Sequence, residues 1–373
     1  MQTPLIITDV SLALFTFEGL PVTTYAAHLS NTTGKSELGL LRVMTSEGIE
    51  GHGLLGSGMR PAGLEARALI EGLKPLLMGK DALNREYLHE LLRRWSRTFT
   101  LRPLGAIDVA LWDIAGKAAG LPIHQLAGNY RDRIPAYASS QKLASAAHYA
   151  EQALAFKELG YQAYKIHPLG HANDDIAVCQ AVREAVGNEY PLMLDASFAY
   201  RFDEAVRVGR AIEQLGFQWY EDPLTEHDIY NYAKLRDKLD IPLMATEMPA
   251  GGLDTYAVWI TQRATDYLRG DVALKGGITT MLKTAHLAEA FNMQYEIHHG
   301  GNSLNNLAGL HVAMAIRNCE YFEVLLPTEA HRYALLNELQ IDKDGFFHAP
   351  TEPGLGAHID FDLIKRNSIA VLT

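Results

Sequence analysis

The sequence predicts an α/β protein in which a parallel (β/α) barrel carries a separate α+β domain. Three carboxylates, Asp195, Glu221 and Glu247, each end an apolar, strand-like run, and 26 residues separate each one from the next. One strand, one helix and two short loops fit that interval, so we expect the carboxylates at equivalent ends of successive parallel strands. The chain has 373 residues, more than the roughly 250 that such a barrel typically uses. A second domain accounts for the remainder.

Residues 1–128 are expected to form the α+β domain. Glycines within residues 47–53, together with the apolar residues 40–43, have the pattern of a hairpin. Residues 15–36 are rich in Thr and in turn formers, and they are interpreted either as a lid or as a surface excursion. Apolar residues recur at helical spacing over residues 66–77, 83–95 and 105–119.

Residues 129–330 are expected to form the barrel, because strand and helix patterns alternate along them. Residues 331–373 return to short strands and turns, and we expect them to pack back on the N-terminal domain. In the barrel region the clearest strands are 134–138, 163–166 and 190–194, and the helices that follow them are 144–159, 176–186 and 202–215.

Composition argues against several classes of protein. The net charge is −11 and the cationic residues form no cluster, which disfavours nucleic-acid binding, although a metal ion can make one pocket attractive to a small anion. Two cysteines, Cys179 and Cys319, do not make a disulfide framework, so a reducing cytoplasm is the expected location. The sequence has neither a signal-peptide pattern nor an apolar run of membrane-spanning length, so no membrane association is expected.

Further polar residues continue the same spacing on both sides of the three carboxylates. Lys165 and His167 lie two residues apart on one expected strand, so their side chains share a face. Asp271, His298 and Glu323 follow at the ends of later strands, and the strand register favours His298 over His299. We therefore expect all these groups to point into one mouth of the barrel.

These residue types indicate a particular chemistry. Three converging carboxylates are hard oxygen ligands that suit Mg²⁺. Removing a proton from the carbon beside a carboxylate creates an enediolate, and a Mg²⁺ ion bound by Asp195, Glu221 and Glu247 would stabilise its charge. Lys165, His167 and His298 are the candidate bases. Asp271 is expected to orient the imidazole of His298 and raise its basicity.

Two more cationic residues are candidates for binding an anionic substrate. Lys275 lies just beyond the strand end that carries Asp271, and His28 lies in the long segment that is interpreted as a lid. Each is also compatible with an ordinary surface position. Tyr137 and Ser139, at the end of the first barrel strand, are expected to be packing residues.

The order and spacing of these residues resemble the enolase superfamily and, within it, the mandelate racemase subgroup. The resemblance covers nearly the whole chain and implies a modified (β/α)7β barrel of the TIM type. It also implies an α+β capping domain formed by the N-terminal region and the C-terminal tail, bound Mg²⁺, and reactions that begin with removal of a proton alpha to a carboxylate. The motifs that carry it, beyond the residues above, are Tyr-Glu-Asp-Pro at 220–223, Ala-Thr-Glu at 245–247, Gly-Leu-Gly at 354–356 and the helical residues 105–113.

The resemblance also implies roles for individual residues. Asp271 and His298 are similar to the catalytic dyad of the family, and Glu323 is similar to a carboxylic acid that hydrogen-bonds the substrate carboxylate. His167 stands where the family usually has a second lysine that acts as the base, so it is either a base or a substrate-binding group. Ser197 stands where many relatives have Asn, which affects only the surroundings of the metal site.

The resulting functional prediction is a Mg²⁺-dependent hydro-lyase. It would dehydrate an acid sugar, an aldonate or aldarate, to a 2-keto-3-deoxy acid. The alternative is a racemase, epimerase or cycloisomerase that uses the same site. A metal-dependent hydrolase is disfavoured because such sites usually recruit histidines to the metal. A non-catalytic binding protein is disfavoured because, among the expected catalytic positions, His167 is the single departure. A homo-oligomer is expected.

Overall fold

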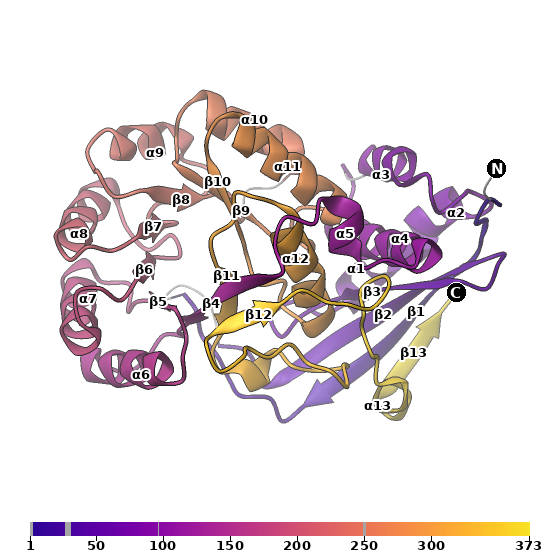
Figure 1. Cartoon of the computed structure of the whole chain (residues 1–373), viewed down its shortest axis with the longest axis horizontal. Coiled ribbons are helices and arrows are strands. Elements are labelled where there is room, and N and C mark those ends of the chain that lie inside the picture. The colour runs from indigo at the N-terminus through magenta and orange to yellow at the C-terminus, as the bar shows by residue number, and fades with distance from the viewer. Residues whose placement is uncertain (1–2, 27–30, 96, 249–250) are drawn as a thin grey trace.

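The computed structural model describes residues 3–26, 31–95, 97–248 and 251–373. Its elements form a closed parallel barrel and, beside it, an antiparallel sheet with its own helices (Figure 1). This arrangement confirms the predicted fold class, a (β/α)7β barrel with an α+β cap. In the described part of the chain, no helix combines the length and the apolar character that crossing a bilayer requires.

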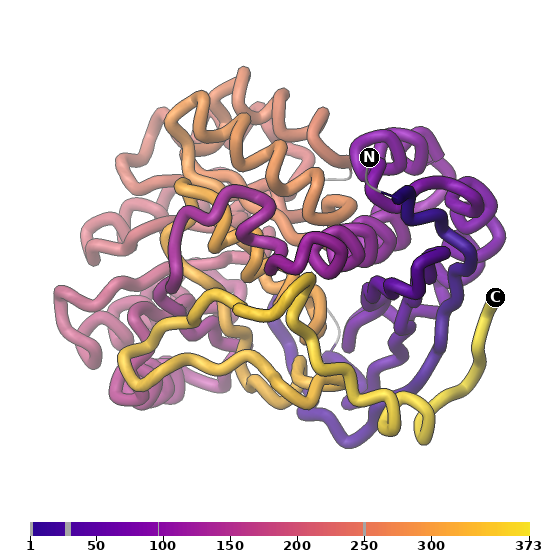
Figure 2. The backbone as a smooth tube through the Cα atoms, turned by 45° about the vertical axis from the view of Figure 1, so that its right-hand side comes forward, coloured from indigo at the N-terminus to yellow at the C-terminus, as the bar shows by residue number. Residues whose placement is uncertain are grey.

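The cap is built on a four-stranded antiparallel sheet in the order β13-β1-β2-β3. The C-terminal strand β13 pairs with β1, with Leu372 opposite Leu12, so the two ends of the chain meet in one sheet (Figure 2). Another part of the tail, β12 (Phe346–His348), instead extends the barrel sheet by pairing antiparallel with β4. The strands of the cap are β1 (Ile7–Glu18), β2 (Lys35–Thr45), β3 (Glu50–Leu55) and β13 (Ser368–Leu372).

Helices α1 to α4 and the stretch η1 pack on one face of this sheet, whereas Phe361 of α13 contacts His52 on the other face. The expected helix over residues 66–77 is interrupted by a π-helical stretch, η1 (Ala68–Leu73), a variation that apolar spacing does not reveal. The longest cap helix, α4 (Arg102–Ala119), has Pro at its start and ends at Gly120, whose positive φ suits a helix C-terminus. The other helices are α1 (Gly63–Arg67), α2 (Lys74–Leu77), α3 (Arg85–Arg93), α5 (Ile123–Ala127) and, near the C-terminus, α13 (Phe361–Arg366).

Helix α4 packs against the cap sheet at two glycines, where the backbones of helix and strand are in direct contact. A Cβ atom placed on Gly53 would lie 2.1 Å from the carbonyl oxygen of Ala106, and one on Gly51 would lie 2.1 Å from that of Ala110. Only glycine permits this approach. The other side of α4 is fixed to the barrel, where the side chain of Asp108 accepts hydrogen bonds from Thr279 at 2.9 Å and 2.6 Å.

The barrel consists of eight parallel strands joined by seven helices. Each strand pairs with the next, and β11 pairs with β4 to close the ring. A large apolar core lies between the strands and the surrounding helices. The strands are β4 (Arg133–Ser139), β5 (Ala163–Ile166), β6 (Leu192–Asp195), β7 (Trp219–Glu221), β8 (Leu243–Ala245), β9 (Tyr267–Gly270), β10 (Gln294–Ile297) and β11 (Phe322–Leu325). The helices are α6 (Ala146–Glu158), α7 (Ala172–Val186), α8 (Phe202–Gln214), α9 (Ile229–Arg236), α10 (Leu253–Thr261), α11 (Ile278–Ala290) and α12 (Ser303–Ala315), and a short 3-10 turn, η2 (Thr328–Ala330), follows β11.

Inside the barrel, two layers of inward-facing side chains follow one another along the strands. Successive inward positions are two residues apart. The apolar layer consists of Tyr137, Ala163, Met193, Trp219 and Met244 with Tyr267 and Tyr321 against them. The charged layer lies two residues further along five of these strands and consists of Lys165, Asp195, Glu221, Arg269 and Glu323.

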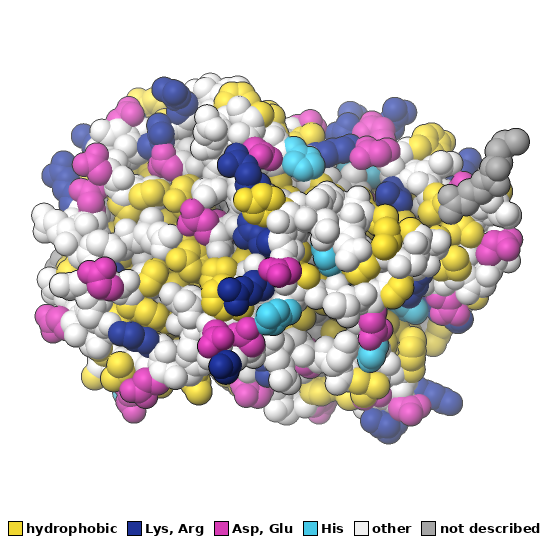
Figure 3. Space-filling model, viewed as in Figure 1, with side chains coloured by type: hydrophobic (Ala, Val, Ile, Leu, Met, Phe, Trp, Pro, Cys, Tyr) yellow, Lys and Arg dark blue, Asp and Glu magenta, His cyan; other side chains and the backbone are white. Residues whose placement is uncertain are grey.

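The outer surface is ordinary for a water-exposed protein. On the face seen in Figure 3, acidic and basic side chains alternate over the helices and loops. This distribution agrees with the modest negative net charge of the sequence.

Candidate active site

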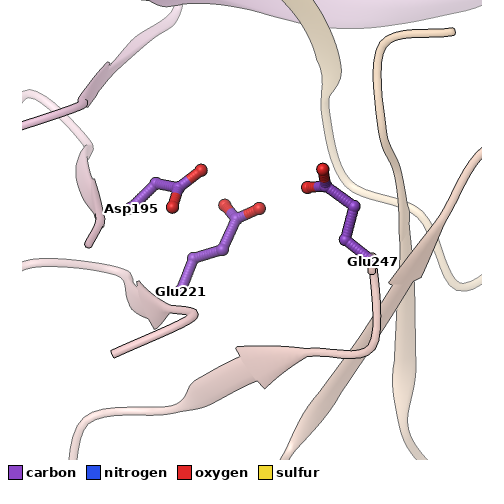
Figure 4. A group of neighbouring side chains, drawn as sticks. All are labelled: Asp195, Glu221 and Glu247. Atoms are coloured by element: carbon purple, nitrogen blue, oxygen red, sulfur yellow. The ribbon is translucent and has the colours of Figure 1, made fainter. Parts of the chain in front are cut away.

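The three predicted metal ligands lie together at the carboxyl ends of neighbouring strands. Asp195 ends β6 and Glu221 ends β7, where the two residues are paired in register, and Glu247 follows β8 by two residues. One oxygen from each carboxylate lies within 4.8 Å of the others, and the three side chains point toward one another (Figure 4). An all-oxygen set at this separation fits a divalent hard cation such as Mg²⁺.

Ser197 orients one of these carboxylates. Its backbone N–H and its hydroxyl donate hydrogen bonds to Oδ1 of Asp195, at 2.9 Å and 3.1 Å. A serine therefore supports Asp195 at the position where many relatives of the predicted family have Asn. Its φ of 45° shows that the chain turns sharply directly after the ligand.

Lys165 lies beneath the carboxylates as a fully buried cation. Its Nζ is 3.0 Å from Oε2 of Glu221, 3.2 Å from Oδ2 of Asp195 and 2.8 Å from Oε1 of Glu323. Burial and Arg269 lower the pKa of Lys165, but Glu221 and Glu323 outweigh them and hold it well above its ordinary value. These contacts favour the charged form of Lys165, and its role as a base stays a prediction.

Arg269 is the buried residue that sequence reasoning missed. Its Nε lies 2.6 Å from Oε1 of Glu221, and its Nη2 donates to the hydroxyl of Tyr137 at 3.0 Å and to Glu323. Both the arginine and its partners are almost completely shielded from solvent. The sequence did contain a signal for it. Arg269 lies two residues before Asp271, so the two side chains face the same side of the strand. An arginine inside a barrel strand requires carboxylate partners.

Asp271 and His298 form a hydrogen-bonded pair at the ends of β9 and β10. His298 Nδ1 lies 2.6 Å from Oδ2 of Asp271, and its Nε2 lies 3.2 Å from Oε1 of Glu247. Burial lowers the pKa of His298, but Glu247 and Asp271 outweigh burial and raise it to about 9. Burial raises the pKa of Asp271, whereas the hydrogen bond and charge of His298 bring it below its ordinary value. The imidazole therefore holds a proton at neutral pH.

His167 enters from β5, on the other side of the metal ligands from His298. Its Nδ1 lies 2.6 Å from the carbonyl oxygen of Ser140, which can only accept, so Nδ1 carries a hydrogen. Its Nε2 lies 3.0 Å from Oδ2 of Asp195. The second nitrogen thus faces a metal-ligating carboxylate at the edge of the site, so both ring nitrogens lie against oxygen acceptors.

Glu323, whose expected role as a carboxylic acid that binds the substrate carboxylate stays a prediction, lies deep in the charged layer. It is fully buried, and its oxygens contact Lys165 and Arg269 and accept the backbone N–H of His299 at 2.9 Å. Burial raises the pKa of Glu323, but Arg269 and Lys165 outweigh burial and hold it well below the ordinary value. Glu323 is therefore a carboxylate, and it is absent from the walls of the cavity described below.

The two further candidates for substrate binding remain predictions. Lys275 is buried, with its Nζ 5.1 Å from the centre of the Tyr256 ring, and it does not line the cavity. Burial lowers its pKa to about 8. His28 lies outside the described residues.

A cavity of about 720 Å³ opens above the metal ligands, between the barrel and the cap. The barrel contributes its strand ends, and the cap contributes residues from the segment after β1 and from the start of α4. The hydroxyl of Tyr25 donates to the carbonyl of Leu326 at 2.9 Å, which ties the described part of the candidate lid to the barrel. Residues from both parts line the cavity, among them Tyr25, Arg60, Arg102, His167, Glu247 and His298.

Comparison with known families agrees with this geometry. Residues 15–128 match the family described as "Mandelate racemase / muconate lactonizing enzyme, N-terminal domain", and residues 148–363 match "Enolase C-terminal domain-like". The protein belongs to the mandelate racemase and muconate lactonizing enzyme family of the enolase superfamily. The resemblance inferred from the sequence is thereby confirmed.

Several characterised relatives are acid-sugar enzymes. The crystal structure of D-glucarate dehydratase from Agrobacterium tumefaciens, complexed with magnesium, matches with a TM-score of 0.88 and 36% identity, covering 99% of this chain and 100% of that chain. Arabinonate dehydratase of Saccharolobus solfataricus is 30% identical over 86% of this chain and 87% of its own length. D-galactarolactone cycloisomerase of Agrobacterium fabrum is 30% identical over 80% of this chain and 84% of its own length.

Proposed function

We propose that this protein is a Mg²⁺-dependent dehydratase that converts an acid sugar to a 2-keto-3-deoxy acid. The observation that carries the proposal is the position of His298, whose Nδ1 is held by Asp271 at 2.6 Å and whose Nε2 lies 3.2 Å from the metal-ligating Glu247. An imidazolium at that position suits protonation of a departing hydroxyl group. The two dehydratases among the relatives described above support the same reaction class.

The residues divide the work as follows. A Mg²⁺ ion held by Asp195, Glu221 and Glu247 would neutralise charge that develops on the substrate carboxylate. His167 presents Nε2 to the cavity and, when neutral, can take the proton from C2. His298 gives its Nε2 proton to the C3 hydroxyl, which leaves as water. Lys165 stays charged and stabilises the ligand carboxylates from below.

A single-histidine route is the other possibility within this proposal. In that route His298 would remove the C2 proton and return it to the C3 hydroxyl on the same face. The raised pKa of His298 disfavours this order of events, because the ring must first lose its proton. Deuterium exchange distinguishes the two routes. If His167 is the base, the His298→Asn variant still exchanges the C2 hydrogen with solvent, whereas the His167→Asn variant does not.

Isomerisation is the second candidate function. The same groups can remove a C2 proton and return it without expelling a hydroxyl, and the related D-galactarolactone cycloisomerase shows that this family includes such an enzyme. The two functions share the site and differ in the product that is released.

A substrate screen tests the proposal. The purified protein with MgCl₂ is incubated with a panel of aldonates and aldarates, and 2-keto acids are detected as semicarbazones. We expect 2-keto acid from at least one acid sugar, no product after EDTA treatment, and no product from the His298→Asn control. Epimers or opened lactones without 2-keto acid would favour the isomerase, and conversion of none of these compounds would refute the dehydratase.

A further inference from the structure

The cavity contains a second candidate anion-binding position, on the cap side. Arg102, the first residue of α4, lines the cavity and is partly buried. Its guanidinium makes no hydrogen bond or ion pair with any residue that the structure describes, although its backbone N–H donates to the hydroxyl of Thr100. An arginine that lines a cavity without an anionic partner is positioned to bind an anionic ligand there.

The barrel carboxylates near Arg102 are already engaged by other donors. Asp271 uses Oδ2 for His298, and its Oδ1 accepts the backbone N–H groups of Ala273 and Leu274, each at 2.7 Å. Glu247 contacts Nε2 of His298 through Oε1. Oε2 of Glu247 lies 3.5 Å from Nε of Arg269. The charges of both carboxylates reach Arg102, but each carboxylate already has a cationic partner.

The nearest cap carboxylate is engaged as well. Glu65 accepts from Nε of Arg60 at 2.8 Å through Oε1 and from the hydroxyl of Thr100 at 2.5 Å through Oε2. Arg60 therefore has its own anion, whereas Arg102 has none among the described residues. Burial lowers the pKa of Arg102, which is the expected consequence of a cation that lacks a close partner.

Other basic residues on the described cavity wall do not offer the same opportunity. Lys35 is exposed, and its Nζ lies 2.5 Å from Oε1 of Glu18. Burial lowers the pKa of His331 to about 4 and lowers that of His299 well below its ordinary value, so both rings are neutral. The unpaired positive charge of the wall is therefore concentrated at Arg102.

We propose that Arg102 binds a second carboxylate of the substrate, at the end of the chain away from the metal ligands, so that the preferred substrates are aldarates. The guanidinium has a fork of N–H donors that matches a carboxylate in two-point contact. A six-carbon diacid would then span the cavity from the carboxylates of the barrel to the start of α4. This inference rests on the proposed dehydration and specifies its substrate class.

Kinetics on matched substrates test it. Each aldarate is paired with the aldonate of the same length and configuration, such as galactarate with galactonate. We expect the wild-type protein to favour the aldarate, and Arg102→Met to raise KM for the aldarate at least about tenfold, as loss of a charge-assisted hydrogen bond implies. The variant should leave kcat/KM for the aldonate within about threefold. Arg102→Lys should restore part of the loss, and Lys35→Met, which removes a paired cation from the same wall, should change neither value.

Either of two results on the matched pairs would overturn the inference, and a third substrate provides a further test. Wild-type preference for the aldonate is one. The other is an equal loss on both substrates in Arg102→Met, which would mean that Arg102 acts through the charge of Asp271 and not on the substrate. A preference for a 6-phosphoaldonate over the aldarate would also exclude the diacid.

A binding measurement separates this inference from the proposed function. Thermal unfolding of wild-type protein with Mg²⁺ is followed with galactarate or with galactonate. A larger stabilisation by galactarate, lost in Arg102→Met, supports the inference even if neither compound is dehydrated, in which case the dehydratase proposal alone fails. Equal stabilisation by both compounds in the wild-type protein contradicts the inference, whatever the activity.

Discussion

Two neighbouring layers of the barrel interior have the same backbone and nearly the same burial but opposite chemistry. The apolar layer and the charged layer lie two residues apart on the same strands. In the apolar layer, side chains such as Trp219 fill space. In the charged layer, Lys165 and Arg269 offset Glu221 and Glu323. The comparison shows that apolar packing fills the first layer, whereas opposite charges compensate one another in the layer nearer the carboxyl ends of the strands.

Removal of Arg269 should produce the largest change in stability. Arg269→Met keeps the bulk of the side chain but leaves Glu221 and Glu323 with one cation in place of two. Breaking a buried ion pair from one side costs about 3–5 kcal/mol of unfolding free energy. Urea unfolding followed by circular dichroism measures the loss. The exposed Arg67→Met, which breaks only a surface pair with Glu71, serves as the control and should leave the unfolding midpoint nearly unchanged.

If Arg269→Met matched the stability of the wild-type protein, the charged layer would not depend on charge compensation, and the contrast between the two layers would be lost.

A cavity in the apolar layer should cost somewhat less and should not affect the metal site. Met193 is fully buried and lies two residues before Asp195 on β6. Met193→Ala should lower the free energy of unfolding by about 2–5 kcal/mol, because the space cannot collapse completely. Mg²⁺ affinity, measured by calorimetry, should stay within about threefold of wild type. A loss of affinity as large as the loss of stability would show that the apolar layer also positions the ligands.

The hydrogen-bonded pair of Asp271 and His298 should determine the pH above which activity is lost. The pKa of His298 is raised to about 9, so its acid form is present below that pH and is lost as the pH rises through it. Asp271→Asn removes one of the carboxylates that raise this pKa, so the alkaline limb of kcat should move to lower pH. The maximum of kcat should also fall by at least about 10²-fold. Profiles of kcat against pH for the wild-type protein and the variant test this prediction. If the alkaline fall in kcat stays at the same pH, a group other than His298 causes it.

The smallest expected effect concerns Glu296, which pairs in register with Arg269 and lies in the same interior. Burial raises the pKa of Glu296 to about 7 from an ordinary 4.5. Because the folded-state pKa is the higher one, this carboxyl stabilises the fold when protonated, and the contribution falls as the pH rises through about 7. Glu296→Gln should therefore gain stability relative to wild type by about 1 kcal/mol between pH 6 and 8.

Urea unfolding of both proteins at the two pH values measures this difference, and a constant difference would mean that Glu296 does not titrate in that range.

The contrast between the layers also explains what could be predicted from the sequence. Strand ends, the three carboxylates and the order of Asp271 and His298 follow from spacing along the chain, which is local information. The partners of Arg269 are different, because Glu221 and Glu323 lie on β7 and β11, each two strands away from β9, and meet it only once the sheet curls into a barrel. The charge of Glu323 likewise depends on Arg269 and Lys165, which lie on other strands, so it could not be predicted from spacing.

Two features of the fold were missed for similar reasons. The pairing of β12 with β4 is a contact between distant segments, and nothing in the composition of residues 346–348 specifies it. The π-helical stretch η1 keeps the apolar spacing of an ordinary helix closely enough that periodicity does not distinguish the two.

The bare-backbone contact of α4 has a consequence for substrate selection. Gly51 and Gly53 leave no side chains over which α4 could slide, and Asp108 ties the same helix to Thr279 of the barrel. Arg102, at the start of α4, is therefore held at a fixed distance from the metal ligands. Under the proposed role of Arg102, that distance would set the length of the substrate chain, and two glycines that do not line the cavity would help to determine it.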